Sequence, residues 1–383
     1  MSMRIYNSVF IAIFMAMLAL PLLFVDLASD RISVQENRML ANFPELSDIK
    51  RHPETFIRGF DVWFKDSTGF REQMLIPYNV ISKNKWLNNI WYTDGQYIYL
   101  IGEEGHHYFT FNGSLIRKFQ GKPFLSDDQL TNMAAKLDAV KIYLDDKGIP
   151  LIVMFCTDKE SVYPEFYPRS IKRGPEPIQL DVITAYLQEN TGVDVFNIRQ
   201  ALFANKNNYL LYPLVDDKSH APRDYLHFNE IGAFFTYREL MKHINVYFPQ
   251  IIPYELNDVN IHYDGNGAPN VSLKAKTVYR KLDPSFFDDV IVKRPFTLEN
   301  EAYENENPDL PVILFIRDSY TFENYFGTYF PSHFGKAIFI HYQNMKRFDE
   351  YIDKYKPDIV VFQSAERQLS WFADEVAGIP KLP

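Results

Sequence analysis

Apolar runs of strand length alternate with helix-like segments along two stretches of the chain, and this alternation restricts the fold more than any other sequence feature. Between the runs, apolar residues recur at the spacing of an α-helix. Strands that alternate with helices form a parallel sheet covered by helices on both faces. We therefore predict an α/β fold. The predicted strands are 151–155, 193–196, 312–316, 337–341 and 358–362, and the predicted helices are 126–144, 178–189, 229–247, 321–330 and 344–355.

Local signals mark the ends of some of these elements. Ser126 and Gln129 have the spacing of a capping box, which begins a helix, and Gly148 fits the end of that helix. Residues 92–111 alternate around a Gly-Glu-Glu-Gly segment, as in a hairpin.

Other parts of the chain have less regular patterns. Residues 56–85 have helical spacing, with breaks expected at Gly59 and Gly69. Residues 255–310 are rich in Asn, Asp, Pro and Gly and predict an insertion or a small β subdomain. The predicted parts of the chain are a membrane segment (1–28), an N-terminal extension (29–125), the first part of the α/β domain (126–254), the insertion (255–310) and the second part of the α/β domain (311–383).

The N-terminus carries an uncharged, mostly apolar run from Ile5 to Val25, which Asp26 ends. About 20 apolar residues suffice for a helix to cross a bilayer. A cleavable signal peptide is the alternative, but the residues around Asp26 make a poor small-x-small cleavage site. We therefore predict an uncleaved signal-anchor that attaches the protein to the membrane, with the rest of the chain extracytoplasmic: periplasmic or on the outer face of the cell membrane.

Composition narrows the possible partners. The net charge is −9 and no Lys/Arg run is present, so nucleic acid is an improbable ligand because phosphate binding needs clustered cations. The apolar content of 46% fits a globular protein and excludes disorder. Asp158, His106 and His107 are spaced unlike metal ligands, and the sequence predicts neither a metal nor a cofactor.

Ser319 follows the predicted strand 312–316 and precedes a predicted helix. In open α/β sheets, functional groups gather at the carboxyl ends of strands. There the serine hydroxyl can act as a nucleophile, and nearby backbone amides can bind an oxyanion. The alternative is that Asp318 and Ser319 merely turn the strand into a helix cap.

His227 has Asp224 three residues before it. The carboxylate can accept a hydrogen bond from one ring nitrogen and leave the other nitrogen as a base. The alternative is a surface histidine that caps the helix beginning near Asn229. Together with Ser319, these residues favour a Ser-His-Asp site for acyl transfer.

Three further residues follow predicted strands and are candidates for substrate binding. Lys159 and Tyr163 come after strand 151–155, where a surface Lys-Glu pair beside a packed tyrosine is the alternative. Arg367 comes after strand 358–362 and can hold substrate or help the oxyanion site, with a structural ion pair as its alternative.

Five segments in sequence order carry a resemblance to a known family. They are Glu36-Asn37-Arg38-Met39-Leu40-Ala41 with Phe43-Pro44, Phe64-Lys65-Asp66 with Gly69-Phe70-Arg71, Lys159 with Tyr163-Pro164, His227-Phe228-Asn229 with Gly232-Ala233, and Arg317-Asp318-Ser319-Tyr320. In these segments the chain resembles the SGNH-hydrolase-like polysaccharide O-acetyltransferases, typified by the alginate O-acetyltransferases. The resemblance implies an SGNH-hydrolase-like parallel sheet flanked by helices, with permuted strand order, a β-rich insertion and an N-terminal membrane anchor.

The resemblance also implies roles for residues and partners. Ser319 would be acetylated, His227 would be the general base, Asp224 would orient it, and Arg317 would bind substrate. The acceptor would be a secreted or cell-envelope polysaccharide, and a membrane-bound O-acyltransferase would supply the acetyl group. The family usually places the acid two residues before the histidine, where this chain has Tyr225. A carbohydrate acetyl-esterase and a non-catalytic carbohydrate-binding scaffold remain alternatives.

Overall fold

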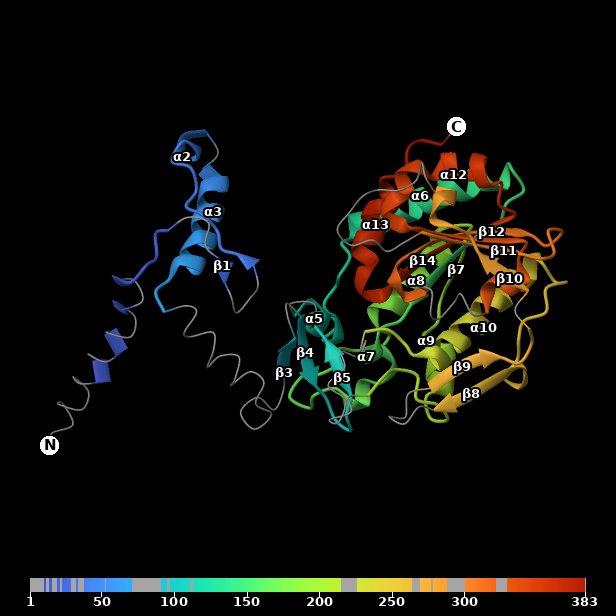
Figure 1. The fold of residues 1–383 in the computed structure, drawn as a ribbon, viewed down its shortest axis with the longest axis horizontal. Coiled ribbons are helices and arrows are strands. Elements are labelled where there is room, and N and C mark those ends of the chain that lie inside the picture. The colour runs from blue at the N-terminus through green and yellow to red at the C-terminus, as the bar shows by residue number, and fades with distance from the viewer. Residues whose placement is uncertain are drawn as a thin grey trace. The chain divides into compact units, whose positions relative to one another are not determined.

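The computed structural model describes most of the chain after residue 97 and shorter parts before it (Figure 1). The described residues are 10–11, 14–15, 19–20, 23–28, 32–33, 38–51, 53–70, 91–94, 97–110, 113–214, 226–263, 269–276, 278–287, 300–321 and 329–382. The chain divides into two compact units, Met1–Ile98 and Tyr99–Pro383.

The principal helix of the first unit is α3 (Pro53–Ser67). It runs through Gly59, so the predicted break there is wrong, although the helix does end before Gly69. A Cβ on Gly59 would lie 3.1 Å from Cβ of Pro44, so the glycine lets that segment approach the helix. The other elements of this unit are β1 (Ile32–Ser33), β2 (Arg38–Met39), α2 (Asp48–Arg51) and β3 (Trp91–Asp94).

The predicted membrane anchor at 5–25 lies largely outside the described residues. In the part of the chain that the structure does describe, no helix has both the length and the apolar character needed to cross a bilayer. Attachment to a membrane therefore remains a prediction.

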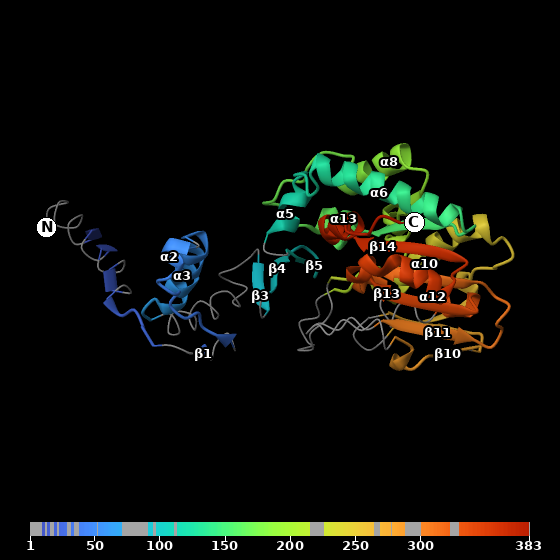
Figure 2. The same cartoon turned by 90° about the horizontal axis from the view of Figure 1, so that it is seen from above.

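The second unit contains a central sheet that confirms the predicted parallel pairing. β12 (Val312–Arg317) pairs in parallel with β13 (Lys336–His341) on one side and with β14 (Ile359–Ala365) on the other. β14 pairs in parallel with β6 (Leu151–Cys156), and β6 with β7 (Asp194–Asn197). Within the described ranges the sheet has seven strands, in the order β10-β11-β13-β12-β14-β6-β7. Figure 2 labels β14, β13, β11 and β10 along this order, and β12, which it does not label, lies between β14 and β13.

The predicted insertion at 255–310 is divided between two structures. β8 (Val259–Tyr263) and β9 (Pro269–Leu273) form a separate antiparallel pair. β10 (Tyr279–Lys281) and β11 (Glu301–Asn305) instead extend the central sheet, antiparallel to each other and to β13. The second half of this segment is therefore part of the main sheet rather than a subdomain of its own.

Helices cover both faces of the sheet (Figure 1). Along each strand, alternate side chains enter opposite cores: Phe155 and Leu314 enter one, and Met154 and Phe315 the other. The first core is covered by α6 (Asp127–Asp145), α8 (Gln179–Asn190), α12 (Phe348–Tyr355) and α13 (Leu369–Ala377), and the second by α9 (Arg199–Asn205) and α10 (Glu230–Tyr247). The two layers hold the parallel strands in a water-free environment, as a parallel sheet requires.

Shorter elements connect these layers. The predicted helix at 344–355 begins as a 3₁₀ helix, and most of the predicted helix at 321–330 lies outside the described residues. Two short α-helices are α5 (Ser114–Phe119) and α7 (Lys159–Val162), and the 3₁₀ helices are η1 (Pro164–Phe166), η2 (Leu256–Asp258), η3 (Pro284–Phe287), η4 (Ser319–Thr321), η5 (Phe330–His333), η6 (Tyr342–Arg347) and η7 (Glu366–Gln368).

The predicted hairpin is confirmed, and it belongs to the second unit. Tyr99 to Ile101, in β4 (Tyr97–Ile101), pair antiparallel with β5 (His107–Phe109). The boundary between the compact units lies at residues 98 and 99, whereas the sequence predicted the α/β domain to begin at 126.

Three neighbouring parallel strands end at one edge of the sheet. β12, β14 and β6 are adjacent in that order, so their carboxyl ends lie together. Ser319 follows β12, Arg367 follows β14 and Asp158 follows β6. This edge therefore collects side chains that are far apart along the chain, and it is the candidate site.

The structure confirms the predicted capping box of α6. The Ser126 hydroxyl accepts from the amide of Gln129 at 3.1 Å, and the Gln129 side chain accepts from the amide of Ser126 at 3.1 Å. We expect Ser126→Ala to lower the free energy of unfolding by about 1 kcal/mol, because it leaves a helix amide without its acceptor. Urea unfolding would measure this loss. Thr131→Ala, at an exposed position of the same helix, is the control and should be neutral or slightly stabilising. Equal effects of the two substitutions would contradict the role of the cap.

Candidate active site

Ser319 stands on a turn that the preceding residue fixes in place. The buried carboxylate of Asp318 accepts hydrogen bonds from the Gln363 side chain at 2.8 Å, from the Ala365 amide at 2.6 Å and from the Tyr320 amide at 2.9 Å. Gln363 and Ala365 belong to β14, the neighbouring strand. Asp318 therefore anchors the turn to the sheet and presents the next residue, Ser319, beyond the strand end.

His227 is placed by the start of α10. The Asn229 side chain caps this helix, accepting from the amides of Ile231 and Gly232 at 3.1 Å each. The same residue ties the helix start to another loop, because its amide donates to Leu211 O at 2.9 Å. Only glycine fits at 232, since a Cβ there would lie 2.7 Å from Leu211 O. These contacts fix the backbone two residues after the histidine.

The structure brings Ser319 and His227 together. Oγ of Ser319 lies 3.0 Å from Nε2 of His227, and Nη2 of Arg367 lies 3.2 Å from the same nitrogen. A guanidinium only donates hydrogen bonds, so Nε2 must be an acceptor and the ring proton must sit on Nδ1. The serine hydroxyl then also donates to Nε2. In this state the serine proton already points at a base. Asp224, the predicted orienting acid, lies outside the described residues.

The Tyr320 side chain contacts both His227 and Arg367. Its ring packs edge-on against the His227 ring, with centroids 4.7 Å apart, and lies 4.6 Å from the Arg367 guanidinium carbon. Its hydroxyl donates toward Leu226 O at 2.9 Å, next to the histidine. The residue after the serine thus positions the residue before the histidine.

A cluster of buried charges lies behind Arg367. Asp158 accepts from Arg367 Nη1 at 2.6 Å through Oδ1 and from Lys118 Nζ at 2.7 Å through Oδ2. Nζ of Lys118 also lies 2.9 Å from Glu160 Oε1 and 3.3 Å from Glu366 Oε1. Glu366 accepts from the Asp158 amide and from the hydroxyls of Thr157 and Ser161. All five charged side chains are almost fully buried, at 2–6% exposure.

Electrostatics divide the acids of this cluster into two kinds. Burial opposes the charge of Asp158, but Lys118 and Arg367 hold its pKa below the usual value. Burial raises the pKa of Glu160 to about 7. The nearby acids Asp158 and Glu366 act in the same direction, and Lys118 opposes them. Despite burial, Asp158 and its neighbours raise the pKa of Lys118 and that of Arg367. Among the residues that the structure describes, no group of acids, histidines and cysteine is arranged as a metal site.

Two of the predicted substrate-binding residues support a loop instead of facing a cavity. Lys159 is buried, donates to Pro213 O at 2.6 Å and lies over the Tyr108 ring. Burial lowers its pKa to about 7. Tyr163 is also buried, and its hydroxyl accepts from the Leu211 amide at 3.1 Å. Both contacts hold the segment near 211–213, and Leu211 O in that segment accepts the hydrogen bond from Asn229 at the start of α10.

Arg317 has a structural environment that differs from its predicted substrate contact. The side chain is 4% exposed; Nη2 pairs with Glu301 at 2.5 Å and Nη1 donates to Thr321 O at 2.7 Å. The pair joins β12 to β11 across the intervening strand β13. A role of Arg317 in substrate binding stays a prediction, because the charge of an arginine does not reveal which way its side chain points from a strand end.

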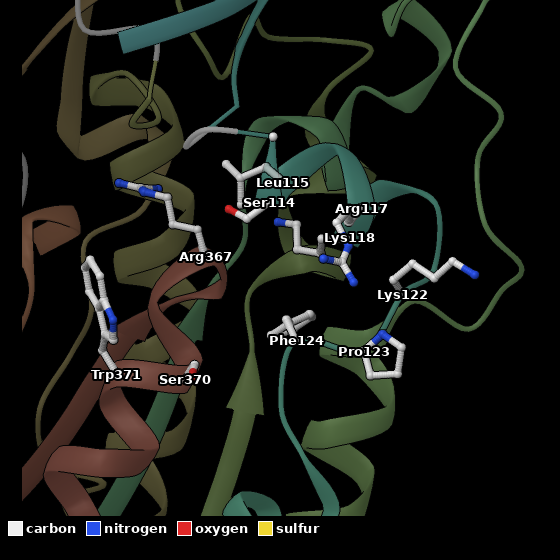
Figure 3. A pocket seen from close by; sticks show the side chains of 11 residues that line it. Ser114, Leu115, Arg117, Lys118, Lys122, Pro123, Phe124, Arg367, Ser370 and Trp371 are labelled. Atoms are coloured by element: carbon white, nitrogen blue, oxygen red, sulfur yellow. The ribbon is translucent and has the colours of Figure 1, made fainter. Parts of the chain in front are cut away.

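Arg367 is the predicted binding residue that reaches both the Ser-His pair and a cavity. A cavity of about 640 Å³ lies between α5 and the start of α13 (Figure 3). Arg367, Ser370 and Trp371 line one side, and Arg117, Lys118 and Phe124 line the other. The indole of Trp371 is 49% exposed. Lys118 and Arg367 thus belong both to the lining of this cavity and to the buried charge cluster.

Four residues of the site had no catalytic or substrate-binding role in the sequence predictions: Asp158, Lys118, Glu366 and Tyr320. Three of them did carry a usable signal, since Asp158, Glu366 and Tyr320 directly follow predicted strands or the candidate nucleophile. Lys118 carried none. It lies on a short helix 40 residues before the carboxylate that it contacts.

The comparisons with known proteins give structural similarity only. No family model and no curated protein matches the chain. Similar solved structures include a DHHW family protein from Eubacterium siraeum, with 13% identity and a TM-score of 0.49, covering 76% of this chain and 97% of that one. Bacillus cereus PatB1 has 14% identity and a TM-score of 0.47, covering 73% and 97%. The O-acetyltransferase domain of Pseudomonas putida AlgJ has 12% identity and a TM-score of 0.43, covering 73% and 98%. At these values none of them assigns an activity to this chain.

Glu160→Gln should change how stability depends on pH. Because the pKa of Glu160 is raised from 4.5 to about 7 on folding, its contribution to stability is fully present below pH 4.5 and is lost as the pH rises through 7. The loss amounts to at most about 3 kcal/mol. Glutamine stays neutral and avoids it. The melting temperature of the variant, relative to the natural chain, should therefore be higher at about pH 7.5 than at about pH 5.

Thermal unfolding of both proteins at the two pH values measures this difference. Glu165→Gln is the control, because Glu165 is an exposed acid on the following turn and pairs with Lys206. Its effect on melting should be nearly independent of pH. A difference for Glu160→Gln that shrinks as the pH rises would contradict the buried, proton-binding state of this acid.

Proposed function

We propose that this protein is an O-acetyltransferase that moves acetyl groups onto hydroxyls of a secreted or cell-envelope polysaccharide through an acetyl-Ser319 intermediate. The observation that carries the proposal is the 3.0 Å contact between Ser319 Oγ and His227 Nε2, with the serine at a strand end. The resemblance of the five sequence segments supports polysaccharide as the acceptor. The same resemblance supports an SGNH-hydrolase-like fold with permuted strand order.

The chemistry follows from that contact. Nε2 of His227 takes the hydroxyl proton while Oγ attacks the carbonyl carbon of the acetyl donor. The carbonyl electron pair moves to oxygen, and its return expels the donor's oxygen, which receives the proton from Nε2. A sugar hydroxyl then attacks the acetyl-serine by the same route in reverse. Asp224 would accept a hydrogen bond from Nδ1, the ring nitrogen that carries the proton in the geometry above.

The acetyl donor and the location form part of the proposal. Acetyl-coenzyme A is confined to the cytoplasm, so an extracytoplasmic enzyme needs a membrane-bound O-acyltransferase to deliver acetyl groups. An N-terminal anchor at residues 5–25 would keep the second unit near that partner. Both statements rest on the sequence alone.

We assign the acceptor sugar to the cavity beside Arg367. Trp371 offers an exposed aromatic face on which a sugar ring can stack, and Ser370 and Arg117 add hydrogen-bonding groups to the walls. Hydrolysis by the same site is the competing outcome, because water and sugar differ only as acceptors of the acetyl group. An empty or blocked acceptor cavity would favour water.

Ser319→Ala should abolish acetyl transfer. The experiment incubates the protein with an acetyl ester and an oligosaccharide. Mass spectrometry then detects the acetylated sugar and the acetylated peptide that contains Ser319. Removal of the nucleophile should lower the rate by at least about 10³-fold. Ser285→Ala, at an exposed serine of η3, is the matched control and should behave as the natural chain. Full activity of Ser319→Ala would refute the proposal and leave a binding or scaffold role.

Trp371→Ala should separate transfer from hydrolysis. Loss of the stacking contact should weaken sugar binding by about 1.4 kcal/mol, which corresponds to a rate of transfer to an oligosaccharide about tenfold lower. The release of free acetate to water should stay unchanged. Tyr263→Ala removes an equally exposed aromatic residue on β8 and should change neither rate. If both rates fall together for Trp371→Ala, the cavity is not an acceptor site. If only acetate ever forms, at any oligosaccharide concentration, the protein is an esterase.

A further inference from the structure

Arg367 and Ser319 compete for one lone pair. Both donate toward Nε2 of His227, Arg367 from 3.2 Å and Ser319 from 3.0 Å. A neutral imidazole nitrogen has a single in-plane acceptor site. Once Nε2 takes the serine proton, it becomes a donor with a positive charge, and the guanidinium beside it then has neither an acceptor there nor a favourable charge. The observed position of Arg367 therefore suits the state before proton transfer and not the state after it.

The surroundings of Arg367 allow its Nη2 to move while the rest of the side chain stays. Nη1 is held by Asp158 at 2.6 Å, and Lys118 holds the same carboxylate from its other oxygen. The guanidinium lies on the Tyr320 ring at 4.6 Å, a flat surface with no bond that blocks rotation. The Arg367 side chain also lines the cavity beside α5 (Figure 3). A small turn about the Nη1–Asp158 contact redirects Nη2.

We propose that Arg367 is a catalytic residue that exchanges partners: Nη2 leaves His227 and donates to the oxyanion of the tetrahedral intermediate on Ser319. The inference rests on the acetyl transfer proposed above. In the step, the Oγ–C bond forms, the Oγ proton goes to Nε2, and the carbonyl electron pair becomes the oxyanion that Nη2 binds. When the intermediate collapses, the C–O bond to the donor breaks, that oxygen takes the proton from Nε2, and Nη2 returns to the free nitrogen.

In the ligand-free site, the contact with Arg367 keeps His227 ready to accept the serine proton. Before substrate enters, the guanidinium keeps the imidazole in the tautomer that accepts the serine proton, because Nη2 can donate only to an unprotonated Nε2. When the acetyl carbonyl enters, its oxygen offers Nη2 a better acceptor, and the stabilisation appears only as negative charge develops. One side chain thus sets the base and binds the anion at different stages.

A structure of the protein treated with phenylmethylsulfonyl fluoride tests the exchange directly. The sulfonyl group bonded to Ser319 Oγ places an oxygen where the oxyanion would form. We expect Nη2 within about 3.1 Å of a sulfonyl oxygen, no longer within hydrogen-bond distance of Nε2, and Nη1 still on Asp158. An adduct with Nη2 still on Nε2 overturns the exchange while leaving the acetyl transfer intact. A serine that never reacts overturns both proposals.

Kinetics of the acetylation step give a second test. With p-nitrophenyl acetate, Arg367→Met should slow the release of p-nitrophenol in the first turnover about 10²- to 10³-fold with little change in KM. Arg367→Lys should recover only part of the rate, because one ammonium cannot hold Asp158 and the oxyanion at once. A change confined to KM, or a rate near that of the natural chain, overturns the inference.

Arg199→Met is the control for removing a buried guanidinium. Arg199 is 8% exposed and pairs with Asp181 and Glu176, so its loss should lower stability as Arg367→Met does, with the acetylation rate unchanged. If Arg367→Met fails to fold, Arg367→Lys and the sulfonyl adduct of the natural chain still decide the question. Ser319→Ala run in parallel separates the two proposals, because full activity of this variant counts against acetyl transfer itself, whereas an unchanged rate of Arg367→Met alone counts only against the exchange.

Discussion

The buried carboxylate of Asp158 holds the candidate site together. It receives Lys118 from α5 and Arg367 from the turn after β14, and the Tyr320 hydroxyl lies 3.2 Å away. Taking such charges out of water is costly, and the cost is offset only while every partner is present. Removal of one partner would leave an uncompensated charge in the interior. The positions of the Arg367 guanidinium and of the imidazole that it contacts therefore depend on this one residue at the end of β6.

The parallel core could be predicted because each strand is long enough, and apolar enough, to be recognised locally. β12, β13, β6 and β7 lie within one residue of the predicted strands, and β14 ends three residues beyond its predicted end. β10 and β11 were predicted only as parts of a β-rich insertion and not as strands of the central sheet, for a physical reason. Tyr279, Arg280 and Lys281 have no apolar period, and their strand exists only because β11 offers backbone partners from more than 20 residues away. Pairing energy of this kind leaves no trace in a short window of sequence.

The same distinction explains which site residues could be predicted. Ser319 and His227 were found from what immediately surrounds them, a strand end and a helix start. The substrate-binding role of Arg317 and Lys159 stays a prediction, and in the structure both side chains are buried in contacts with Glu301 and Pro213. A sequence shows that a cation follows a strand, but the tertiary fold decides whether its side chain is buried against an acceptor. The role of Asp224 as the acid that orients His227 stays a prediction.

The antiparallel strands β10 and β11 have a consequence for how this protein behaves at high concentration. An open parallel sheet that ended at β13 would present a long row of unpaired backbone groups, with which a strand of another molecule could pair. β10 is instead three residues long, and Arg280 and Lys281 project from it as exposed charges paired with Glu304 and Glu301 of the neighbouring strand. A strand this short, with charged side chains along it, offers the sheet of a second copy few backbone groups with which to pair.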